Sequence, residues 1–187
     1  MVFMNRGEEE HMRLTLIVIC LCLVTALLYA CRGTGQKSTL EVVPSVDLER
    51  YIGTWYEIAR YPNSFQKEDC VNTTATYALR EDGKISVLNK CLKDSGDGPE
   101  STANGKAWVV DSKTNAKIKV QFFWPFSGDY WIIQLGEQYE YAVVGHPDRA
   151  YLWILSRTPK MDPVLYQRVL VRLREQGYDP EQLIVVQ

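Results

Sequence analysis

The sequence predicts an all-β domain of eight antiparallel strands in up-and-down order, followed by one C-terminal α-helix. Three observations support this fold class. Short stretches of alternating apolar and polar residues recur from Gly53 onward. Turn-forming residues separate these stretches at intervals of about 10 to 15 residues, which is typical of sandwiches and barrels. One amphipathic stretch follows them near the C-terminus. A chain of 187 residues that is 46% hydrophobic can bury a full core.

The expected strands are short, and they share the alternating pattern. The clearest places Ile118, Val120 and Phe122 on one face and charged or polar side chains on the other. That strand therefore has a dry face and a wet face. The eight expected ranges are 54–60, 71–80, 84–91, 103–110, 117–123, 130–135, 140–144 and 151–156, and residues 183–186 can add a further short strand.

The helix is predicted by its two ends and by its apolar spacing. Asp162 is a suitable N-cap, and Pro163 suits the first helical position. Gly177 can end the helix in the left-handed conformation. Between these ends, Leu165, Val169 and Leu173 recur at helical spacing, so one face of the helix packs against an apolar surface.

Short links between the strands favour neighbouring antiparallel pairs, and closing such a meander removes both exposed edges. An eight-stranded barrel is just wide enough to be filled by side chains or to hold one small ligand. The strand pattern alone leaves both alternatives open.

The N-terminal region resembles a bacterial lipoprotein signal. Residues 14–29 carry no charge and are shorter than the roughly 20 residues of a membrane span. They end in Leu28-Tyr29-Ala30-Cys31, which resembles a lipobox, so we expect cleavage before Cys31 and acylation of that cysteine. Plain secretory cleavage and an uncleaved anchor are the alternatives. We expect translation to start at Met1 or at Met12, and the chain divides into a signal (1–30), a tether (31–44) and a domain (45–187).

Two cysteines flank the tight turn at residues 81–83. Cys70 precedes the second expected strand and Cys91 ends the third, so an antiparallel hairpin places them opposite each other. An oxidising compartment permits a disulfide there. Two buried free thiols are the alternative.

Three segments together resemble the lipocalins, and bacterial lipocalins in particular. They are GTWYEIARY (53–61), TATYALREDGKISVLNKC (74–91) and YLWILSRTP (151–159). The resemblance implies a barrel floor formed by Gly53 and Trp55, with Arg157 lying across the indole in a cation–π contact. It also implies that four segments surround the open mouth: 61–69, 92–102, 124–129 and 146–150. The segment Asp148-Arg149-Ala150-Tyr151 departs from the family's usual Thr-Asp-Tyr motif.

Strand alternation then assigns a ligand cavity. Glu57 shares the facing of Trp55, so it points into the lumen as a polar anchor or as a hydrogen-bonded structural residue. The expected wall residues are Ile118, Val120, Phe122, Trp131, Tyr141 and Trp153.

The mouth segment around Trp124-Pro125 is strongly aromatic. Phe123, Trp124 and Phe126 stand where a strand meets solvent. Their rings either fold inward and cap the cavity or form a portal that contacts a membrane or a partner. The second alternative includes movement of an acyl chain between bilayer and barrel.

Composition and motifs narrow the function to binding. The net charge is −2, and no basic run interleaved with aromatics indicates nucleic acid. No metal motif, cofactor motif or nucleophile is found, and the histidines are His11 and His146, so we expect no enzyme, no cofactor and no metal.

The expected partner is a fatty acid or lysophospholipid, with a lipid anchor in the bacterial outer membrane facing the periplasm. A structural stress-response lipoprotein with a filled barrel is the runner-up. A homodimer is left open.

Overall fold

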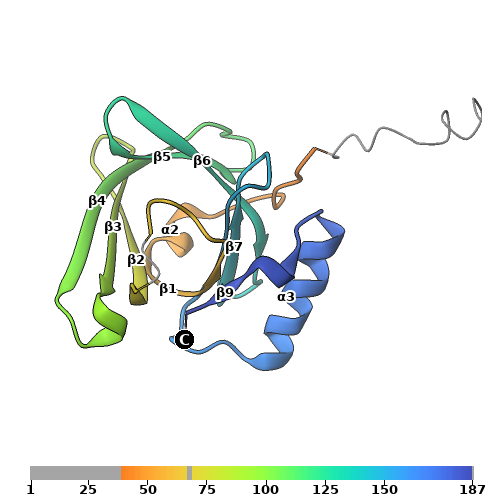
Figure 1. Cartoon of the computed structure of the whole chain (residues 1–187). Coiled ribbons are helices and arrows are strands. Elements are labelled where there is room, and N and C mark those ends of the chain that lie inside the picture. The colour runs from red at the N-terminus through yellow and green to blue at the C-terminus, as the bar shows by residue number, and fades with distance from the viewer. Residues whose placement is uncertain (1–38, 67–68, 187) are drawn as a thin grey trace, which may run out of the picture. The chain divides into compact units, whose positions relative to one another are not determined.

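The computed structural model describes residues 39–66 and 69–186, and these residues form a closed antiparallel barrel with a helix on its flank (Figure 1). The sheet order is β2-β3-β4-β5-β6-β7-β8-β1-β9, and an additional β1–β2 pairing closes the ring. The predicted lipidation site Cys31, the signal and most of the tether lie outside the described residues.

The strands follow the predicted order. Their bounds are β1 Gly53–Arg60, β2 Val71–Leu79, β3 Ile85–Leu92, β4 Glu100–Val109, β5 Lys117–Phe123, β6 Phe126–Leu135, β7 Tyr141–Gly145, β8 Leu152–Ser156 and β9 Ile184–Val185. The helical elements are α2 Leu48–Tyr51, η1 Asp94–Gly96, α3 Pro163–Glu175 and η2 Pro180–Gln182.

Two predicted strands were too short at their N-terminal ends. The fourth strand begins at Glu100 rather than 103, and the sixth begins at Phe126 rather than 130. Both extensions are poor in buried apolar residues, so hydrophobic alternation does not mark them. They exist because the neighbouring strand supplies hydrogen-bonding partners, as in the pairings Leu92↔Glu100 and Phe123↔Phe126. Two of the predicted mouth segments, 92–102 and 124–129, are therefore shorter than expected.

Helix α3 begins and ends as predicted. The Asp162 side chain accepts a hydrogen bond from the Leu165 backbone N–H, and Gly177 adopts a φ of +80°. Val169 and Leu173 are buried. Helix α2 was not predicted, because its four residues are too few to show a helical period; the Asp47 carboxylate caps it.

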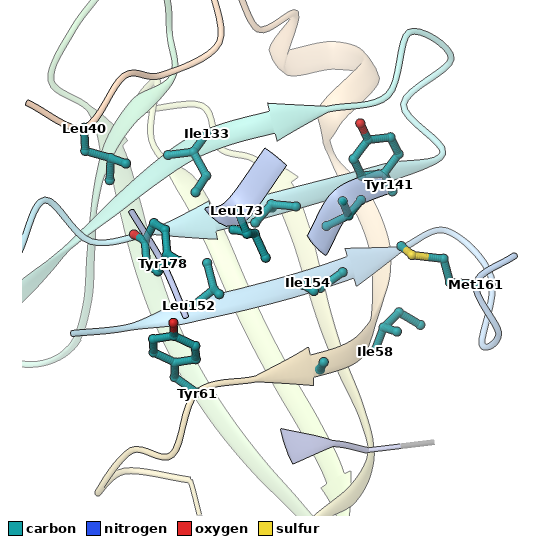
Figure 2. Packing of buried hydrophobic residues seen from close by; sticks show 13 residues of the cluster. Leu40, Ile58, Tyr61, Ile133, Tyr141, Leu152, Ile154, Met161, Leu173 and Tyr178 are labelled. Atoms are coloured by element: carbon teal, nitrogen blue, oxygen red, sulfur yellow. The ribbon is translucent and has the colours of Figure 1, made fainter. Parts of the chain in front are cut away.

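The buried side chains form two separate clusters on the two faces of the barrel wall. The outer cluster lies between the barrel and α3 and includes Ile133, Leu152, Ile154 and Leu173, as Figure 2 shows. The inner cluster fills the lumen near α2 and includes Trp55, Ile118 and Ile132. Strands β1, β6, β7 and β8 contribute to both clusters because successive side chains point to opposite faces, whereas β2 to β5 contribute only to the inner cluster.

Among the described residues, no helix is both long enough and apolar enough to span a membrane.

Candidate functional site: a barrel with a sealed floor and an accessible mouth

Trp55 seals one end of the barrel. Its side chain is 0% exposed, and its indole Nε1 donates to the Tyr51 carbonyl oxygen at 2.8 Å. The Arg157 guanidinium lies 3.8 Å from the centre of the Trp55 ring, so the predicted cation–π contact is present. Gly53 adopts a φ of +96°, and a Cβ there would lie 3.3 Å from Arg157 Nη1. The floor therefore needs glycine for its backbone conformation and for space.

Arg157 also holds α2 in place across the floor. Its Nη2 donates to the carbonyl oxygens of Arg50, Tyr51 and Ile52 at 2.7, 3.1 and 2.9 Å. The last carbonyls of a helix have no intrahelical donors, so this guanidinium satisfies them. Arg157 thus joins helix α2 to Trp55 at the barrel floor.

Three tyrosines fill the lumen above the floor, and the sequence did not predict them as a group. The Tyr130 hydroxyl lies 2.8 Å from that of Tyr51 and 3.1 Å from that of Tyr77. Burial raises the pKa of Tyr77 to about 12 and raises the pKa of Tyr51 and Tyr130 above their ordinary value. All three stay neutral at physiological pH. For Tyr77 and Tyr130 the signal in the sequence is alternation, because each shares an inward facing with a residue of its own strand, Ala75 and Ile132. Tyr51 belongs to α2 and has no such signal.

Little space remains between these tyrosines and α2. The enclosed cavity there measures about 10 Å³ and is lined by apolar and tyrosine side chains, among them Ile85, Ile118 and Val120. That volume is too small for any part of a hydrocarbon chain. The lower half of the barrel is packed by its own side chains.

The inner face becomes accessible toward the mouth. Along β5, Ile118 is 3% exposed, whereas Val120 and Phe122 are half-buried. Along β4, Ala107 is 3% exposed, whereas Ala103, which shares its facing, is exposed. Exposure of the inner face therefore increases from the floor toward the mouth, where small residues such as Ala103 take part in it.

A polar group stands on the inner wall between the two halves. Arg60 Nη1 donates to Glu57 Oε1 at 2.9 Å, and both side chains are buried. Gln66 Nε2 donates to Glu57 Oε2 at 2.7 Å, and Trp153 Nε1 donates to Gln66 Oε1 at 3.1 Å. Burial raises the pKa of Glu57, and the bonds from Gln66 and Arg60 oppose that rise. Glu57 thus points into the lumen as expected, with hydrogen-bonding partners.

Two further polar atoms on the inner wall have no hydrogen-bond partner within residues 39–66 and 69–186. They are Thr73 Oγ1 and Asn89 Oδ1. Both residues lie on the inward-facing rows of neighbouring strands, since Ala75 pairs with Asn89 and Thr73 lies two residues before Ala75. Buried polar atoms are normally satisfied, so these two atoms are exceptions on the inner wall.

Two predicted wall residues lie outside the lumen, and their assignment to the cavity was wrong. Tyr141 belongs to the outer cluster under α3, and Trp131 packs against the same cluster with Lys117 over its ring at 4.4 Å. Trp131 pairs with Lys117, which precedes the inward-facing Ile118, and Tyr141 precedes the inward-facing Ala142, so both side chains point outward. Trp153 packs with the inner cluster, as predicted, together with Val120 and Phe122.

The mouth carries a disulfide and a group of exposed aromatic rings. Cys70 and Cys91 are bonded, with their Cα atoms 5.5 Å apart, so the predicted pairing is confirmed. Phe123, Trp124 and Phe126 are 78%, 86% and 78% exposed at the tip of the β5–β6 hairpin. Their rings do not fold inward over the cavity. The described residues contain no cluster of His, Cys, Asp and Glu that could hold a metal ion.

The lipocalin-like domain family matches residues 46–187, which include nearly all of the barrel and the helix. This chain belongs to the lipocalins. It is 42% identical over 162 residues to outer membrane lipoprotein Blc of Escherichia coli, covering 86% of this chain and 90% of that protein. It is 40% identical over 156 residues to temperature-induced lipocalin-1 of Arabidopsis thaliana, covering 79% and 82% of the two chains.

Solved structures support the fold of this lipocalin. Insecticyanin from the tobacco hornworm Manduca sexta superposes with a TM-score of 0.64 at 21% identity, covering 82% of this chain and 86% of that chain. Lipocalins are binding proteins, so family membership agrees with the expectation that the chain is not an enzyme.

Proposed function

We propose that this lipocalin holds the hydrocarbon part of a single-chain lipid, a fatty acid or a lysophospholipid, in the mouth half of its barrel. The observation that carries the proposal is the gradient of accessibility along the inner face. Ile118 at the floor is buried, and Val120 and Phe122 above it are half-buried apolar side chains open to a guest. Each methylene transferred from water onto such a surface contributes about 0.8 kcal/mol.

The packed floor limits how deep a ligand reaches. An acyl chain ends above the tyrosines, because only about 10 Å³ is free below them. The Glu57–Arg60 ion pair would then lie beside the acyl chain and not at the open end of the barrel. Charge pairing is unnecessary for micromolar affinity, since about fifteen buried methylenes would supply about 12 kcal/mol, which leaves about 8 kcal/mol after an association cost of about 4 kcal/mol.

The membrane location follows from the N-terminal pattern and from the relatives. Acylation of Cys31 would anchor the chain, and two relatives carry the name outer membrane lipoprotein, at 42% identity in E. coli and 37% in Vibrio cholerae. We therefore place the protein at the bacterial outer membrane, facing the periplasm. The exposed rings of Phe123, Trp124 and Phe126 would contact the bilayer there and assist lipid transfer.

Displacement of a fluorescent fatty acid from the delipidated protein tests the proposal. Oleate and 1-oleoyl-lysophospholipid are expected to displace the probe at micromolar concentration, whereas a short-chain compound such as decanol should displace it poorly. A delipidated protein that binds neither the probe nor the lipids would favour the filled-barrel structural lipoprotein instead.

A further inference from the structure

The barrel wall is incompletely paired between β4 and β5. Their ladder runs only from Lys106↔Gln121 to Val109↔Ile118. Toward the mouth β4 continues to Glu100, and within the described residues this extension pairs with β3 alone. On the other side, a register shift between Val120 and Phe123 interrupts the β5–β6 ladder. A seam therefore runs down the wall from the mouth to the Lys106↔Gln121 pair.

The Phe122 side chain occupies this seam. Its ring packs so closely on Gly105 that a Cβ at position 105 would lie 2.9 Å from two ring atoms. The same ring packs against the inner cluster of the lumen. The Gln121 carbonyl oxygen would lie equally close, at 2.9 Å. Beyond the last β4–β5 pair, the Phe122 side chain thus stands between the interior of the barrel and its outer surface.

A groove of about 370 Å³ lies on the outer side of the seam. Two cations line it, Arg80 and Lys106, together with the amides of Asn104 and Gln121 and the exposed ring of Trp124. The Arg80 guanidinium forms an ion pair with Asp82, whose Oδ1 lies 3.1 Å from Arg80 Nε, and Asp82 also contacts Lys84. Nitrogen donors of this kind are those that recognise phosphate oxygens.

We propose that this groove binds the phosphate head group of a single-chain phospholipid, while the acyl chain enters the lumen through the seam as the Phe122 ring moves aside. The charge of the groove matches the phosphate, Phe122 lines both the groove and the inner cluster, and Trp124 places the groove beside the hairpin tip. The inference rests on the proposed acyl-binding function and assigns its head-group site to the outer wall.

The head-group test compares two lipids with the same acyl chain. Binding of 1-oleoyl-lysophosphatidate and of oleate to the full chain is measured by probe displacement for wild type and for K106Q/R80Q. The double variant is expected to weaken lysophosphatidate binding about tenfold and to change oleate binding less than twofold, because two charge-assisted contacts are lost. The control K90Q/K119Q removes two lysine charges from the outer wall beyond the groove and is expected to leave both affinities unchanged.

Three results separate the possibilities. Equal lysophosphatidate affinity in K106Q/R80Q and in the control overturns the head-group site and leaves the acyl-binding function standing. Absence of binding of both lipids to wild type overturns the function and the inference together. For the seam, F122A is expected to raise the association rate of lysophosphatidate severalfold, while V110A, at an exposed apolar residue outside the groove and the hairpin tip, leaves the rate unchanged. Equal rates in F122A and wild type overturn the seam as the entry route.

Discussion

The two ends of this barrel are built on opposite principles. At the floor, Trp55 is fully buried, and its indole and the surrounding helix carbonyls all have donors or acceptors. At the mouth, apolar rings are exposed, and polar atoms of Thr73 and Asn89 lack partners within the described residues. The comparison teaches that side-chain packing and hydrogen bonding are most complete at the floor, where Trp55 and Arg157 join α2 to the barrel. The mouth combines exposed apolar rings with the covalent Cys70–Cys91 bond.

The strongest test of this difference between the two ends replaces Trp55, which closes the floor. W55A is expected to lower the free energy of unfolding by about 3–5 kcal/mol, because the substitution leaves a large cavity in a fully packed region. Urea denaturation followed by circular dichroism measures the change. W153F, which makes a half-buried ring near the mouth smaller and removes its hydrogen bond to Gln66, serves as the comparison and is expected to cost about 1–2 kcal/mol. A smaller loss for W55A than for W153F would reverse the assignment of the stable end.

Arg157 should give the second-largest effect. R157Q removes the cation from the Trp55 face and leaves carbonyl oxygens of α2 without their donor. A loss of about 2–3 kcal/mol is expected, combining a partly desolvated cation–π contact with lost charge-assisted hydrogen bonds. R157K keeps the charge and should recover only part of this, since one ammonium does not reproduce the planar fork. Full recovery by lysine would mean that charge alone matters.

Glu57 makes stability depend on pH. Its pKa in the folded protein lies above its ordinary value of 4.5, with burial as the main cause. The folded state therefore holds the proton more tightly than the unfolded state, so this group's contribution is present below 4.5 and is lost as the pH rises through the folded pKa. The unfolding free energy of wild type should therefore decrease relative to that of E57Q as the pH rises above 4.5. Urea titrations at pH 4, 5, 6 and 7 measure it, and a constant difference would contradict the assignment.

Substitutions at the tip of the β5–β6 hairpin should have the smallest effect on stability and a large effect on lipid transfer from vesicles. W124A/F126A is expected to change the unfolding free energy by less than about 0.5 kcal/mol, since both rings are mostly exposed. Transfer of a fluorescent fatty acid from vesicles should slow about fivefold, because less apolar surface enters the bilayer. V110A, an exposed apolar residue at the floor end, is the matched control. Unchanged transfer in W124A/F126A would remove the tip from the membrane contact.

Much of the fold was predictable from local pattern. The alternation of Ile118, Val120 and Phe122 marked the lumen face, and Asp162 and Gly177 marked the ends of the helix. The opposed positions of Cys70 and Cys91 indicated their bond. Each of these signals is contained within one strand, one helix or one hairpin.

The features that the sequence did not reveal depend on contacts between distant segments. The tyrosine group joins α2, β2 and β6, and the outward facing of Trp131 is fixed by its pairing with Lys117 on the neighbouring strand. The seam beside Gly105 is likewise a property of strand pairing, since it exists where β4 outruns its ladder with β5. The Trp124-Phe126 rings could be located on the chain, but their exposure depends on how the hairpin projects.

The two tryptophans that the sequence assigned to the same cavity provide the most direct test of the central claim. Titration with 9,10-dibromostearate should quench the intrinsic fluorescence of wild type, because Trp153 lies on the inner wall beside the bound chain. In W131F the quenching should persist, since Trp131 lies on the outer face under Lys117. In W153F most of it should disappear. Quenching that survives in W153F, or that is absent from wild type, would contradict acyl binding in the mouth half of the barrel.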